Sequence, residues 1–145
     1  GSGGSDGSDQ ELHLVGNAKK IALMAIGLAY QKYLNELEKQ QEVMTTIADL
    51  MMEAFAMESV LLRTRKLRAR AKETNAVDAC AVFLRDGIAR MEVSARQVLG
   101  ACAEGDGLRT QMAVLRRLAR YEPVNAVARR RQISARSLAR ERYGA

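Results

Sequence analysis

Residues 76–102 carry the clearest helical periodicity of the chain, in the sequence AVDACAVFLRDGIARMEVSARQVLGAC. Apolar and small residues recur there at steps of three and four, which places them on one face of a helix. These residues are Val77, Cys80, Leu84, Gly87, Ile88, Met91, Ala95, Val98 and Cys102. The preceding Glu73-Thr74-Asn75 is typical of a turn and an N-cap. The pattern predicts a long amphipathic helix whose apolar stripe is covered by partner helices.

Two further helices are expected before this one. Asn17 can cap the first, in which residues 21–30 are apolar almost all round, and residues 33–39 form the corner that follows it. The second helix ends in the basic run 63–72. Its apolar face is formed by Val43, Ile47, Leu50, Met51, Ala54, Met57 and Leu61.

Two shorter helices are expected after it. Residues 104–107, EGDG, end the central helix and begin the next, whose apolar side is formed by Leu108, Met112, Leu115 and Leu118. Pro123 breaks that helix, and Asn125 can cap a last segment over residues 126–143. Four or five helices joined by short turns predict an all-α fold, a helical bundle.

Length and composition agree with a single domain. The chain has 145 residues, one Pro, no Trp and 4% aromatic residues, which favours helix over strand. Residues 1–13 open with glycine, serine and aspartate, which offer little side-chain volume to bury, so we expect a flexible linker or a remnant of cloning there. Residues 14–145 are expected to form one helical domain.

The charge is basic and concentrated near the C-terminus. The net charge is +6, and residues 116–142 contain nine Arg against two Glu. Such a surplus permits an acidic protein, anionic lipid or nucleic acid as partner, although the scarcity of aromatic residues for base stacking disfavours nucleic acid. The candidate contacts are Arg129, Arg130, Arg131, Arg136 and Arg140. Residues 21–30 are too few to span a bilayer, which needs about 20 residues, and fit either a buried helix or one that dips into a membrane surface.

The sequence predicts no catalytic, cofactor-binding or metal-binding residue. The chain has a single His, expected outside the helices, and no glycine-rich phosphate-binding motif. Asp49 and Glu53 lie one helical turn apart and could act as an acid and a base, but pairing with arginines of neighbouring helices or contact with solvent is the simpler interpretation, as it is for Glu58. Cys80 and Cys102 match no metal-ligand spacing and are expected to be small buried residues.

Several blocks of the chain resemble, in order, the C-terminal extension of acyl-CoA dehydrogenases of the very-long-chain type and their bacterial relatives. The resemblance covers about residues 14–143, and its patterns are those of helix faces rather than a catalytic signature. The blocks are residues 17–20 (NAKK), 31–33 (QKY), 40–43 (QQEV), 47–50 (IADL), 53–63 (EAFAMESVLLR) and 118–125 (LARYEPVN).

In that family the flavin and the catalytic glutamate belong to a region that would precede this chain. The resemblance therefore implies a non-catalytic domain without its own cofactor, cut from an FAD-dependent enzyme of fatty-acid β-oxidation. It implies packing against the remainder of the parent, homodimer assembly or peripheral contact with the inner membrane face, in the cytoplasm. Two alternatives stay open: a self-standing basic helical module that binds an acidic protein, anionic lipid or nucleic acid, and an enzyme that uses Asp49 and Glu53.

Overall fold

The computed structural model describes residues 7–71 and 74–143, and this part of the chain is helical without any strand. The elements are α1 (Gly7–Tyr33), the 3-10 helix η1 (Leu34–Lys39), α2 (Gln41–Ala71), α3 (Thr74–Cys102), α4 (Gly105–Leu118) and α5 (Ala126–Tyr143). The predicted all-α bundle is confirmed.

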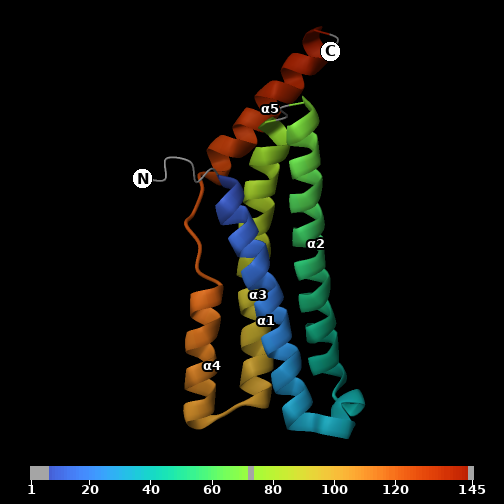
Figure 1. Ribbon diagram of the computed structural model, residues 1–145, viewed down its shortest axis with the longest axis vertical. Coiled ribbons are helices and arrows are strands. Elements are labelled where there is room, and N and C mark those ends of the chain that lie inside the picture. Colours follow the sequence, from blue (N-terminus) through green and yellow to red (C-terminus); the bar gives the residue numbers. More distant parts are fainter. Residues whose placement is uncertain (1–6, 72–73, 144–145) are drawn as a thin grey trace.

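Helix α3 is the centre of the bundle. It packs against each of the other four α-helices, and α1, α2 and α3 together form a three-helix unit. Figure 1 shows α4 beside the lower half of this unit and α5 at its upper end, where α2 finishes and α3 begins. Because α2 and α3 are antiparallel neighbours, the C-terminal turns of α2 and the N-terminal turns of α3 lie at the same end of the molecule.

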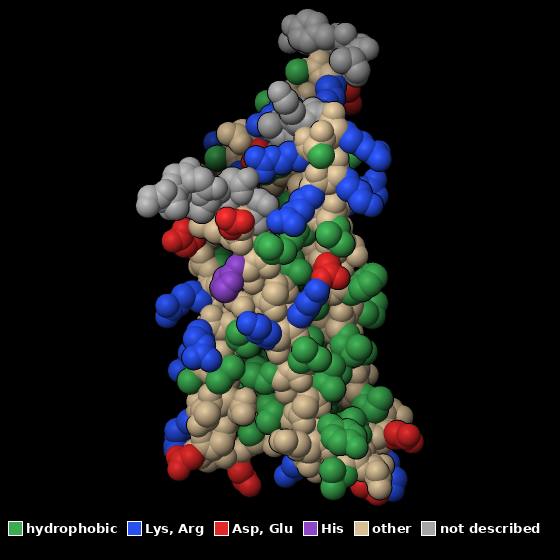
Figure 2. Space-filling view, viewed as in Figure 1, with side chains coloured by type: hydrophobic (Ala, Val, Ile, Leu, Met, Phe, Trp, Pro, Cys, Tyr) green, Lys and Arg blue, Asp and Glu red, His purple; other side chains and the backbone are tan. Residues whose placement is uncertain are grey.

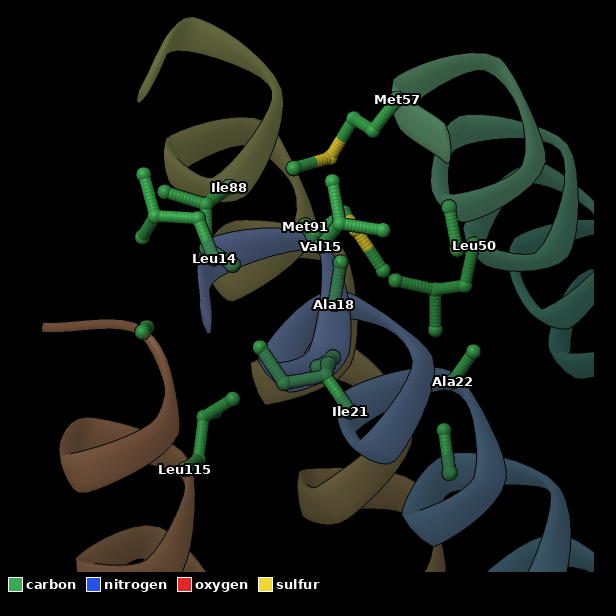
Figure 3. Close-up of a cluster of buried hydrophobic side chains, with 14 of the residues drawn as sticks. Leu14, Val15, Ala18, Ile21, Ala22, Leu50, Met57, Ile88, Met91 and Leu115 are labelled. Carbon is green, nitrogen blue, oxygen red and sulfur yellow. The ribbon is translucent and has the colours of Figure 1, made fainter. Parts of the chain in front are cut away.

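The core is made where α1, α2, α3 and α4 face one another (Figure 3). Most of the predicted stripe of α3 is buried, with Val77 and Cys102 half-buried at its two ends. On α1 the buried positions are mostly small, so the helices approach closely. The largest fully buried side chains are Ile21, Leu50, Met57, Leu84, Ile88, Met91, Leu99 and Leu115.

The N-terminal prediction is corrected by the structure. Helix α1 begins at Gly7, so residues 7–13 of the expected linker are helical, and residues 1–6 lie outside the described part of the chain. The reason is a long-range anchor, because the carboxylate of Glu11 accepts hydrogen bonds from Arg85 Nη1 at 2.9 and 3.1 Å. Asn17 is therefore not an N-cap: it is buried inside α1, and its Nδ2 donates to Nε2 of His13, also helical, at 3.3 Å.

The apolar face predicted for α2 and the start predicted for α3 also need correction, whereas the corner before α2 does not. The corner at residues 33–39 is confirmed as η1, where Leu34 turns the chain with a φ of 45°. Five members of the predicted α2 face are buried and Val43 is half-buried, but Met51 is exposed on another side of the helix. Helix α3 already includes Asn75, so that residue is not its N-cap, and Glu73 lies outside the described residues.

The apolar side predicted for α4 and the N-cap predicted for α5 are confirmed, but α4 ends at Leu118, so Pro123 lies in the connection to α5 and does not break the helix. Leu115 is fully buried and Leu108, Met112 and Leu118 pack against the core as partly buried residues. Gly105 has a φ of +60°, a conformation that glycine adopts without strain, at the turn between α3 and α4. Asn125 caps α5, since its Oδ1 accepts a hydrogen bond of 2.9 Å from the backbone N–H of Ala128.

Candidate functional site

Two of the five candidate arginines on α5 are held by the bundle itself. Asp78 lies on the N-terminal half of α3 and is 8% exposed. Its Oδ1 accepts a hydrogen bond from Arg129 Nη1 at 3.0 Å, and its Oδ2 accepts one from Arg136 Nη1 at 2.7 Å. Arg136 Nη1 also donates to Asn75 Oδ1 at 2.9 Å. Arg129 and Arg136 therefore attach α5 to α3 instead of facing a partner.

The other three candidates lie on the solvent side of α5. Arg130 and Asp86 form an ion pair of 3.4 Å in which both side chains are more than half exposed, so solvent weakens it. Arg131 and Arg140 are exposed. The five arginines thus divide into an inward pair and an outward group of three, and do not make one site.

A second basic segment lies at the same end of the bundle as this outward group. The last turns of α2 contain exposed basic residues, and they end at the same end of the bundle as α5, where Figure 2 shows Lys and Arg side chains gathering. These residues are Arg63, Arg65, Lys66, Arg68 and Arg70. In the sequence these residues are recognisable only as the basic end of a helix. The signal that could have indicated this arrangement is Asp78. This acidic residue lies on α3, shortly after the basic end of α2, and it binds α5.

Two of the three carboxylates considered for acid–base chemistry, Glu53 and Glu58, form ion pairs between helices. Glu53 Oε1 accepts a hydrogen bond of 2.6 Å from Arg90 Nη2 on α3, and this bond raises the pKa of Arg90. Glu58 pairs with Lys19 on α1. Asp49 is exposed and lines, with Glu53, Met52 and Ser94 among others, an open groove between α2 and α3. The expected pairing with a neighbouring arginine is confirmed for Glu53, and its carboxylate serves to join α2 to α3.

The cysteines are not arranged for metal binding or nucleophilic chemistry. Cys80 is 2% exposed and Cys102 is half-buried, and burial raises the pKa of both thiols. Both sulfurs are therefore held as thiols, the less nucleophilic form. Across the described residues no three His, Cys, Asp or Glu side chains come together as a metal site.

One helical segment of the described chain, Asp9–Lys39, is long and apolar enough to cross a membrane when judged by length and composition alone. Of its most apolar window, 44% is buried inside the bundle. Core helices of soluble proteins commonly meet the same criterion. The segment also includes the 3-10 corner η1, so it is not one continuous α-helix.

Comparison with known proteins defines the class. The family described as "Acyl-CoA dehydrogenase, C-terminal domain" matches residues 17–117, and the chain belongs to this family. This chain is 37% identical over 143 residues to a protein named "Probable acyl-CoA dehydrogenase" from Bacillus subtilis strain 168. The match covers 97% of this chain and 24% of that protein.

A solved relative shares the fold. The crystal structure of an acyl-CoA dehydrogenase complexed with FAD from Bacillus anthracis superimposes with a TM-score of 0.90 at 38% identity. The match covers 95% of this chain and 25% of that one. The chain therefore spans about a quarter of the length of the relatives it matches.

Proposed function

We propose that this chain is the non-catalytic C-terminal helical domain of a longer, FAD-dependent acyl-CoA dehydrogenase of fatty-acid β-oxidation, of the very-long-chain type, located in the cytoplasm. We further propose that its work is packing and assembly of that enzyme. The observation that carries this proposal is the near-complete match of the bundle to one quarter of an FAD-complexed dehydrogenase. A quarter that folds around its own core has the anatomy of an added domain.

The interactions of the acidic side chains support a structural role. Glu11, Glu53 and Glu58 each pair with a cation on another helix, and thereby hold α1 to α3, α2 to α3 and α1 to α2. A general base needs a carboxylate that can reach a substrate proton, whereas these carboxylates hold helices together. The catalytic base is therefore assigned to the remainder of the polypeptide.

The flavin is assigned to the remainder as well. A flavin pyrophosphate is usually held where glycines let the backbone approach it closely. In the described residues, Gly87 is the glycine whose added Cβ would meet other atoms, and those atoms are Glu53 Oε1 and Met57 Sδ of the core, each at 3.0 Å. These residues do not fit a dinucleotide cradle, and no step of the reaction is derived from them.

A second candidate function is contact with an anionic surface, either the inner membrane face or an acidic protein. It is favoured by the outward Arg130 and Arg131, which lie at the same end of the bundle as the basic last turns of α2. Basic residues near an anionic membrane surface contribute about 1 kcal/mol each, an attraction that salt screens. Vesicles of anionic lipid that retain the chain at low salt but not at high salt would support this candidate.

The test compares three purified proteins: the full-length polypeptide, the same polypeptide without this domain, and this chain alone. We expect flavin absorption and acyl-CoA oxidation in the first two and neither in the third. Removing the domain should lower the melting temperature of the flavin-binding part or change its oligomeric state, seen by light scattering. Stoichiometric flavin on the chain alone, or a truncated enzyme unchanged in stability and assembly, would contradict the proposal.

A further inference from the structure

Large apolar side chains are exposed along the side of α1 and α2 that faces away from α3. We call this side the α1–α2 outer face. Phe55 is 71% exposed and Leu23 is 66% exposed, although isolated soluble domains seldom leave such large groups side by side in water. Its members are Leu23 and Tyr30 on α1 and Met44, Met51, Phe55 and Leu62 on α2.

The members of this face form one surface. On α2 the spacings of seven, four and seven residues keep them on one side of the helix, and the spacing of seven does the same on α1. The ion pair between Lys19 and Glu58 fixes the register of the two antiparallel helices and places Leu23 level with Phe55. Figure 2 shows apolar side chains gathered over α1 and α2 in the lower half of the bundle.

The charges on this face are already neutralised. Along its length Lys19 is the cation that α1 contributes and Glu58 is the anion that α2 contributes, and the two form an ion pair with each other. Burial of an unpaired charge is costly, but a paired one can be covered without leaving an isolated charge. The face is therefore suited to burial against an apolar protein surface.

Resting on the proposed function, we infer that the α1–α2 outer face is the surface on which the remaining three-quarters of the same polypeptide packs. The chain spans 24–25% of its relatives, so a body about three times its size must lie against some face of the bundle. Helix α1 forms half of this face and begins at Gly7, so the preceding chain reaches the bundle on the same helix.

Other occupants fit the face less well. A helix that lies in a membrane surface carries Lys and Arg along the flanks of its apolar face. Here the exposed basic residues of α2 are concentrated beyond Leu62, at the end of the bundle where α5 lies, while Lys19 is engaged with Glu58. Lipid and a second copy of the chain are therefore treated as alternative outcomes of the test.

The test measures thiol accessibility at one position of the face. Cys102→Ala removes the half-buried thiol, and Phe55→Cys is then introduced into both the isolated chain and the full-length polypeptide. The matched control is Val93→Cys, which is 55% exposed on α3 and outside the face. A far-UV circular dichroism melt of each isolated variant checks that it folds.

We expect a maleimide probe to label position 55 at least about ten-fold more slowly in the full-length polypeptide than in the isolated chain, because packing must open before the thiol reacts. Position 93 should differ by less than about three-fold. Equal labelling of position 55 in the two proteins would overturn the inference. Protection that grows with the concentration of the isolated chain, or that needs added anionic vesicles, would also overturn it, in favour of a second copy or of lipid.

The two proposals can fail separately. If position 55 stays reactive in the full-length polypeptide while removal of the domain still destabilises the flavin-binding part, the packing surface is wrong and the proposed function stands. If removal of the domain changes neither stability nor assembly, the proposed function fails whatever the labelling result.

Discussion

Replacing Asp78 with asparagine should release α5 from the bundle while the three-helix core stays folded. Among the described elements, α5 packs only against α3. The two ion pairs from Arg129 and Arg136 to Asp78 are the main polar ties across that contact. Asparagine has nearly the same shape as aspartate, so the substitution removes the charge and leaves the apolar packing in place.

The magnitude follows from the exposure of the partners. A hydrogen bond to a charged group contributes about 1.5–3 kcal/mol when buried, and an exposed ion pair contributes about 0.2–1 kcal/mol. The side chain of Asp78 is 12% exposed, but those of Arg129 and Arg136 are 32% and 36% exposed, so the contribution of each pair lies between these limits. A loss of about 2 kcal/mol for both pairs corresponds to roughly a thirty-fold shift toward the undocked helix.

Hydrogen–deuterium exchange measured by mass spectrometry tests this directly. Peptides from residues 129–140 should exchange roughly thirty-fold faster in Asp78→Asn, while peptides from residues 84–99 keep their rates. The control is Asp86→Asn, whose pair with Arg130 is longer and more exposed, with an expected change below about three-fold. Unchanged exchange in α5, or equal acceleration in α3, would refute the assignment of Asp78 as a local anchor.

Other substitutions probe the core and the thiols. Leu84→Ala should lower the free energy of unfolding by about 2–5 kcal/mol, seen as a clear fall in melting temperature, because Leu84 is fully buried; an unchanged melt would mean that the stripe is not the core. Gly87→Ala should lower the free energy of unfolding by about 1–2 kcal/mol despite its gain in helix propensity, because the new Cβ meets two side chains at 3.0 Å. Gly100→Ala has open space around it and should raise the free energy of unfolding slightly, as measured by chemical denaturation. Iodoacetamide should modify Cys102 well before Cys80 in the native protein, as followed by peptide mass spectrometry. Because burial raises the pKa of both thiols, both reaction rates should still be rising as the pH passes the usual thiol pKa of 9.0. Equal rates for the two cysteines would contradict the burial of Cys80.

The helices could be predicted where a single apolar stripe dominates the sequence. The apolar stripe of α3 is clear in the sequence because α3 is the central helix of the bundle, and its stripe faces the other helices. On α2 the prediction was wrong for Met51, because apolar residues occupy two sides of that helix and spacing alone does not say which side meets the core. Asn17 was misplaced for a related reason: the residue type suits a cap, but its partner is the side chain of His13 inside α1.

The start of α1 and the role of the arginines depended on contacts that are distant in sequence. Glu11 is held by Arg85, 74 residues further along the chain, and no local pattern indicates that pair. Arg129 and Arg136 meet Asp78 across 51 and 58 residues. Local composition shows that the last segment is basic, but only the packing of α5 on α3 shows which of its charges are already used.

The sizes of the buried and the exposed side chains on α1 and α2 offer a reason why residues 21–30 are apolar almost all round. The buried side of α1 is lined by alanines such as Ala25, while Leu23 points outward; on α2, Ala54 is buried and Phe55 is exposed. Burying a side chain of the size of Phe55 contributes about 1.5–3 kcal/mol, a stabilisation that this bundle alone leaves unused. A helix that is apolar on all sides is normally covered on all sides. The small inner residues let α1 and α2 pack closely on α3, and the large outer residues leave a second apolar surface, on which we propose that the remainder of the polypeptide packs.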